Sequence, residues 1–135
     1  MNVPMYDFDT HLRRQGVVVR MEPTRVIVLE GILLFVEPAL RDAIDIKIYV
    51  DARPDVRFIR RLRRDILERG RSAEQVCHQY LETVRDMHNT FVEPTKASAD
   101  MIIPNDKDGD RSHAVAVDVL LSHAKVISSR HLLRL

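Results

Sequence analysis

Arginine is concentrated between positions 57 and 71, where seven of fifteen residues carry a guanidinium group. A guanidinium is a planar, permanently charged fork of donors that matches phosphate oxygens. The turn at Glu68-Arg69-Gly70-Arg71 would let such a cluster close over a polyphosphate as a lid. Two other interpretations stay open: a solvated helix with ion pairs such as Arg61–Asp65 and Asp65–Arg69, or a helix that binds RNA or DNA.

Two shorter segments also carry side chains suited to chemistry. Tyr6 to Arg13 combines aromatic rings with His11 over a stretch that looks loop-like, a mixture that would fit recognition of a nucleoside base. Val26 to Leu29 is an apolar run that ends in Glu30 and Gly31. An acid at the carboxyl edge of a buried parallel strand can lie beside Mg²⁺ and phosphates, although an acid also ends many strands in water.

The elements that must position these residues alternate between strands and helices, which predicts a parallel α/β architecture. Three core strands are fewer than the usual four to six or so. A proline and an acid favour a helix start at Pro54, and Gly70 favours its end. A capping-box pattern follows at Ser72. The expected strands are 25–30, 45–50 and 100–104, and the expected helices are 37–43, 54–69, one that begins at 72, and 112–127.

Length and composition favour one domain over residues 1–135 that can bury a core, since 45% of the residues are apolar. A formal net charge of +1 argues against a partner that is a nucleic acid. No stretch approaches the ~20 apolar residues that a membrane span requires. The single cysteine, Cys77, favours a reducing compartment, and we expect a cytoplasmic protein.

Taken in order, these segments resemble the uridine–cytidine kinases of the phosphoribulokinase/uridine kinase family. The arginine block from 60 to 71, which ends in Glu-Arg-Gly-Arg, is the most specific match. The other matching blocks are 6–13, 28–33, 45–51, Gln79-Tyr80, 94–96 and 99–104. The resemblance implies a P-loop kinase-like parallel sheet with flanking helices, and it places the lid and nucleoside-contacting helices within residues 54–90.

The resemblance also implies roles for individual residues. Tyr6 and His11 match the residues that hold the pyrimidine, and Glu30 matches an acid near Mg²⁺. Positions that contact the nucleoside are matched by Arg61, Arg71 and Gln79. Lid arginines that meet the ATP phosphates are matched by Arg64 and Arg69. The implied reaction transfers the γ-phosphoryl group of ATP to the 5′-hydroxyl of uridine or cytidine in pyrimidine salvage, by a homo-oligomer in its full-length form.

One family motif is absent from the 135 residues. Members carry a G-x-x-x-x-G-K-[ST] loop that cradles the phosphates, and the glycines here, at 16, 31, 70 and 109, form no such motif. In the family, the strand before that loop lies between those matched by 26–30 and 45–50. We therefore expect an incomplete, C-terminal two-thirds form of the domain that is inactive alone. The alternative is a nucleoside-binding or regulatory module without catalysis.

Overall fold

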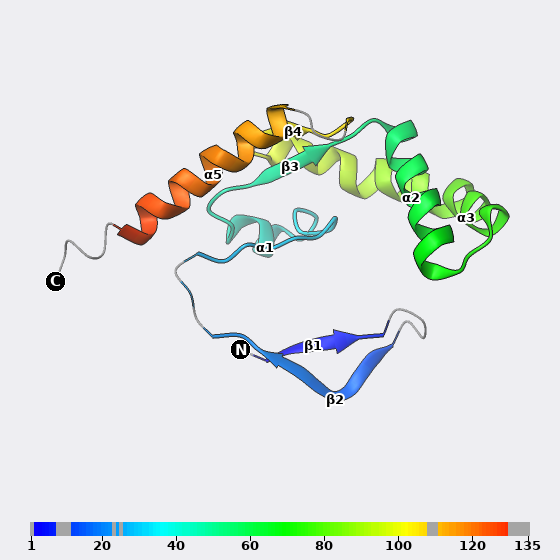
Figure 1. The fold of residues 1–135 in the computed structure, drawn as a ribbon, viewed down its shortest axis with the longest axis horizontal. Coiled ribbons are helices and arrows are strands. Elements are labelled where there is room, and N and C mark those ends of the chain that lie inside the picture. Colours follow the sequence, from blue (N-terminus) through cyan, green and yellow to red (C-terminus); the bar gives the residue numbers. More distant parts are fainter. Residues whose placement is uncertain (1, 8–11, 23, 25, 108–110, 130–135) are drawn as a thin grey trace. The chain divides into compact units, whose positions relative to one another are not determined.

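The computed structural model describes residues 2–7, 12–22, 24, 26–107 and 111–129. It divides into two compact units, Met1–Ile27 with Ala124–Leu135, and Val28–His123, and each unit is described by itself. Figure 1 shows the elements along the chain. The second unit holds the arginine-dense helix and both strands of a parallel pair.

The first unit contains an antiparallel hairpin that the sequence did not predict. Strand β1 (Asn2–Tyr6) pairs with β2 (Arg13–Arg20), and the register shifts between Pro4 and Tyr6. The Asp7 amide donates to the Leu12 carbonyl at 2.8 Å and so begins the connection. Tyr6 therefore ends a strand, where the sequence had indicated a loop.

The second unit contains two parallel strands where the sequence predicted strands 45–50 and 100–104. Strand β3 (Ile48–Asp51) pairs with β4 (Met101–Pro104), from Ile48 opposite Met101 to Asp51 opposite Pro104. Parallel pairing brings both carboxyl ends to one edge. There the Asn105 amide donates to the Asp51 carbonyl at 2.7 Å. The predicted parallel α/β architecture is confirmed for this part of the chain.

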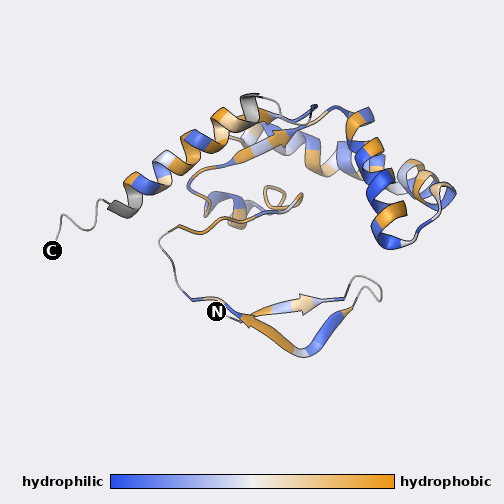
Figure 2. Ribbon diagram, in the orientation of Figure 1, coloured by the Kyte–Doolittle hydropathy of each residue, from blue (hydrophilic) through white to orange (hydrophobic). Residues whose placement is uncertain are grey.

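The predicted strand at 25–30 is wrong. Residue 25 lies outside the described residues, and 26–30 are irregular rather than paired. Ile27 and Val28 are 64% and 87% exposed. Figure 2 shows the hydrophobic colouring of this segment before α1 (Pro38–Asp42). An apolar run becomes a buried strand only where neighbouring strands pair with its backbone, and no strand of the described residues pairs with 26–30.

The remaining helices agree closely with the sequence prediction. Glu37 caps α1 by accepting from the Ala39 amide at 3.4 Å. The helical elements that follow α1 along the chain are α2 (Pro54–Arg69), α3 (Ala73–Gln79), the π-helical η1 (Tyr80–Val84), α4 (Arg85–Met87), the π-helical η2 (His88–Val92), the 3₁₀ segment η3 (Glu93–Ser98) and α5 (Arg111–Ser129).

Both ends of the α2–α3 connection are capped as predicted. Gly70 adopts a left-handed conformation with φ of 62°, and its amide donates to the Asp65 carbonyl. Ser72 and Gln75 form a reciprocal capping box, with N–O distances of 3.2 and 3.0 Å. Beyond the connection, the rings of Phe58 and Tyr80 pack with centroids 4.6 Å apart. Two caps separated by one residue therefore fix how α3 follows α2.

Replacing Gly70 with alanine should destabilise the chain by about 1–2 kcal/mol, because an L-residue disfavours a positive φ. A Cβ atom there would meet nothing within 4 Å, so the cost is conformational rather than steric. Urea unfolding followed by circular dichroism measures it. Gly31→Ala is the matched control, since its Cβ would make an ordinary 3.5 Å contact with Leu34. Equal unfolding midpoints for the two variants would contradict this account of Gly70.

Candidate functional site

A buried carboxylate lies at the centre of the arginine-dense region. The side chain of Asp65, on α2, is fully buried. The Nε and Nη2 atoms of Arg64 donate to its Oδ1 at 3.0 and 2.9 Å, and Arg69 Nη1 lies 3.4 Å from the same oxygen. Two guanidinium groups therefore converge on one oxygen atom.

The second oxygen of Asp65 faces a different pair of arginines. Arg71 Nη1 and Arg61 Nη2 lie 3.6 and 3.8 Å from Oδ2, which accepts no hydrogen bond. Both guanidinium groups donate instead to Gln79 Oε1, at distances of 2.8 Å for Arg61 and 3.1 Å for Arg71. The amide of Gln79, at the end of α3, thereby joins residues on either side of the Gly70 turn.

Positive charge gathers around a single carboxylate. Among the described residues, four guanidinium groups lie 2.9 to 3.8 Å from the Asp65 oxygens. Burial raises the pKa of the Asp65 carboxyl group. The hydrogen bonds and charge of Arg64, together with the charges of Arg61 and Arg69, lower that pKa by more, so that it lies below its usual range. The carboxylate is thus ionised at neutral pH. A ligand with several negative charges would relieve the remaining repulsion.

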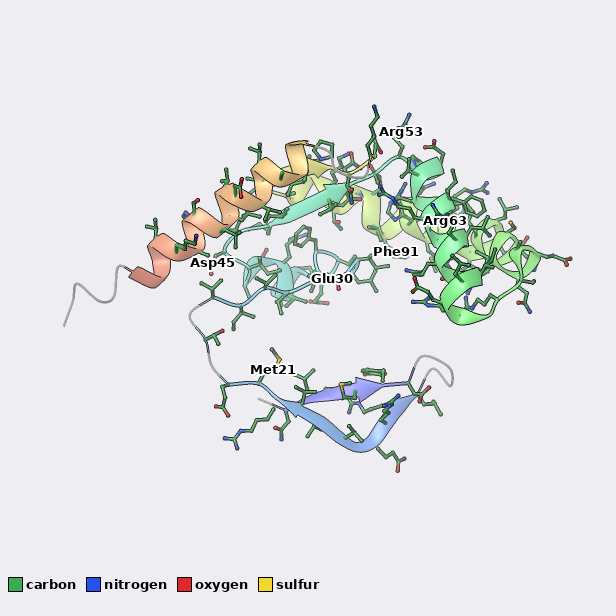
Figure 3. All side chains as sticks on the ribbon, viewed as in Figure 1. Met21, Glu30, Asp45, Arg53, Arg63 and Phe91 are labelled. Atoms are coloured by element: carbon green, nitrogen blue, oxygen red, sulfur yellow. The ribbon has the colours of Figure 1, made fainter. Side chains whose placement is uncertain are left out.

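Five of the residues singled out in the sequence lie together here. They are Arg61, Arg64, Arg69, Arg71 and Gln79. The ion pairs Arg61–Asp65 and Asp65–Arg69, which the sequence offered as the sign of a solvated helix, both form. They form on a buried carboxylate, however, which is unlike a solvated surface pair. Arg63 on the same helix is exposed (Figure 3).

The remaining predicted site residues are not brought to this cluster by the described structure. Tyr6 belongs to the other unit, where the Arg13 guanidinium lies 5.8 Å from the centre of its ring. His11 lies outside the described residues. Glu30 is exposed in the segment before α1 (Figure 3). A pocket formed by Tyr6 and His11 with the arginines stays a prediction.

The donor set available for Mg²⁺ is limited. Within the described ranges, no group of three or more histidine, cysteine or acidic side chains gathers in a way that could hold a metal ion. Mg²⁺ in phosphotransferases is commonly held by one or two carboxylates together with the phosphates of the substrate. Glu30 fits that arrangement as a single protein ligand, and its role stays a prediction.

Asp65 is the residue whose importance the sequence analysis missed. It had been treated only as the partner of neighbouring arginines. Its spacing was a usable signal, because Asp65 lies four residues from both Arg61 and Arg69 and so shares a helix face with both. The additional contact with Arg71 depends on the Gly70 turn, where the Arg71 amide donates to the Asp65 carbonyl at 3.1 Å.

A second ionic cluster lies at the carboxyl end of β3. Asp51 pairs with Lys96, and Tyr49 donates to Glu93 at 3.4 Å. His88 Nε2 contacts Arg57 and lies 3.3 Å from Glu93. Burial and then the Arg57 charge lower the pKa of His88, against smaller opposing effects of Glu93 and Asp51. These contacts connect β3 to α2, η2 and η3.

Across the described helices, none is long and apolar enough to cross a membrane.

Comparison with known proteins agrees with the architecture. The model of the phosphoribulokinase/uridine kinase family matches residues 1–112, which is most of the chain. The chain belongs to this family, whose members are phosphotransferases.

Curated relatives give the same result in more detail. A protein named uridine kinase from Listeria welshimeri is 48% identical over 128 residues, which is 95% of this chain and 59% of the relative. Uridine kinases of Anoxybacillus flavithermus and Chloroflexus aurantiacus are 50% and 51% identical, over 92% and 90% of this chain and 56% of each relative. The chain thus spans less than two thirds of the length of these relatives.

The second cluster predicts a pH-dependent stability. Because the pKa of His88 is lower in the folded chain, the unfolded chain binds a proton first as pH falls through about 6.5. Stability should therefore be full above that pH and decrease below it. Urea midpoints at pH 7.5 and 5.5 should differ more for the unmodified chain than for His88→Gln. The exposed His78→Gln is the control, and an unchanged difference in His88→Gln would refute the assignment.

Proposed function

We propose that residues 1–135 supply the nucleoside-contacting and lid parts of a uridine kinase. The reaction is transfer of the γ-phosphoryl group of ATP to the 5′-hydroxyl of uridine or cytidine, with Mg²⁺. Family membership and the names of the relatives support this proposal. By the same resemblance, the full-length form acts as a cytoplasmic homo-oligomer in pyrimidine salvage.

The observation that carries the proposal is the convergence of four guanidinium groups on Asp65. Phosphoryl transfer depends on positioning and on neutralising charge at the phosphate oxygens. Arg64 and Arg69 are the groups assigned to the ATP phosphates, and they share Oδ1. The pair assigned to the nucleoside, Arg61 and Arg71, shares Gln79. The division of the cluster into these two pairs supports the assignment of one pair to each substrate.

The other assigned groups complete the proposed site. Tyr6 would stack on the pyrimidine and His11 would hydrogen-bond its polar edge, as expected for aromatic recognition of a base. Glu30 would be a ligand of Mg²⁺, the ion that neutralises charge on the phosphates when bound. The roles of these three residues rest on the resemblance.

Replacing Arg71 with lysine should weaken uridine binding about tenfold, because an ammonium group keeps the charge but loses the fork that reaches Gln79. Isothermal titration calorimetry of uridine into the purified chain measures the affinity. Arg63→Lys is the matched control, since Arg63 is exposed on the same helix. If both variants bind uridine as the unmodified chain does, Arg71 has no part in nucleoside binding.

The purified 135 residues should form no UMP from ATP and uridine. The reason is chemical: none of the four glycines belongs to the motif whose amides and lysine hold the phosphates in this family. Incubation with radiolabelled uridine and Mg-ATP, followed by chromatography, tests this expectation. Turnover above a no-protein blank would overturn it. Uridine binding without turnover in longer forms that contain the motif would favour a regulatory module.

A further inference from the structure

Asp65 divides the arginine cluster between its two carboxylate oxygens. Oδ1 receives two hydrogen bonds from Arg64 and lies 3.4 Å from Arg69. Oδ2 receives none and lies 3.6 and 3.8 Å from Arg71 and Arg61. One oxygen is therefore hydrogen-bonded to Arg64 and close to Arg69, whereas the other attracts its pair by charge alone.

We propose that Asp65 is a positioning residue that holds these two arginine pairs apart, so that Arg64 and Arg69 address phosphate while Arg61 and Arg71 address the nucleoside. The assignment of the pairs rests on the function proposed above. Asp65 itself need not touch either ligand, because it is fully buried beneath the guanidinium groups. It acts by fixing where their remaining donors lie.

The chemistry of an amide predicts an asymmetric effect for Asp65→Asn. Asparagine keeps one acceptor oxygen and replaces the other with an NH₂ donor. The oxygen should stay with Arg64, which makes the two shortest contacts at 2.9 and 3.0 Å. The NH₂ group must then face Arg61 and Arg71, which are donors too. Arg64 then keeps its hydrogen bonds in a weaker, uncharged form, whereas the nucleoside pair loses its attraction and meets a donor.

Two ligands separate this asymmetry from a general structural defect. Calorimetry should show uridine binding to Asp65→Asn at least tenfold more weakly than to the unmodified chain. Binding of inorganic tripolyphosphate should change less than threefold or become tighter, since one negative charge has been removed from beside the arginines. Asp86→Asn is the matched control: Asp86 lies 3.1 Å from Arg85, but its side chain is 67% exposed.

The outcomes bear on the two proposals separately. If the unmodified chain binds neither uridine nor tripolyphosphate, the proposed function fails. If it binds both and Asp65→Asn binds both equally well, only the positioning role fails. A parallel loss of both ligands in a variant with native circular dichroism would also overturn the division of the cluster.

A measurement on the unmodified chain covers the case in which Asp65→Asn does not fold. Guanidinium resonances in nitrogen-15 NMR should show hindered rotation for Arg64, as a group bound to a buried carboxylate. Arg63, exposed on the same helix, is the internal comparison. Rotation of Arg64 as fast as that of Arg63 would show that Asp65 does not fix its neighbour, and would overturn the proposal without any substitution.

Discussion

The ionic interaction between one buried carboxylate and four guanidinium groups governs how the end of α2 connects to α3. Removing a carboxylate from water is unfavourable unless charge and hydrogen bonds compensate. Around Asp65 the compensation comes from α2 itself, through Arg61, Arg64 and Arg69, and from beyond its end, through Arg71. The carboxylate thereby ties the helix to the turn that follows it.

The turn at Gly70 explains how residues of α2 and α3 come together around Asp65. Gly70 ends α2 and Ser72 begins α3, so Arg71 is the single residue between two caps. With so little freedom, Arg71 reaches back to Asp65 while Gln79 approaches from the end of α3. The position of the Arg71 guanidinium beside Asp65 is therefore set by the backbone geometry of the turn.

Local features of the fold were predictable from the sequence, and features that depend on distant partners were not. The limits of α2 follow from Pro54 and Gly70, and the capping box at Ser72 marks α3. The run at 26–30 looks like a buried strand, but pairing needs neighbours that its own residues do not specify. The resemblance singled out the five residues that gather around Asp65, and their roles stay predictions. The role of Asp65 required coordinates, because its burial arises from side chains that fold over it.

The two π-helical segments have a consequence for how this chain can vary. A π turn takes about one residue more than an α turn, so the side chains after it are rotated by about 100° relative to a continuous α-helix. Segments η1 and η2 lie on either side of α4 and so set the direction in which His88 and Val92 point. Along this stretch, gaining or losing a single residue would redirect a whole face of the helix, whereas most exchanges of side chains would leave its orientation intact.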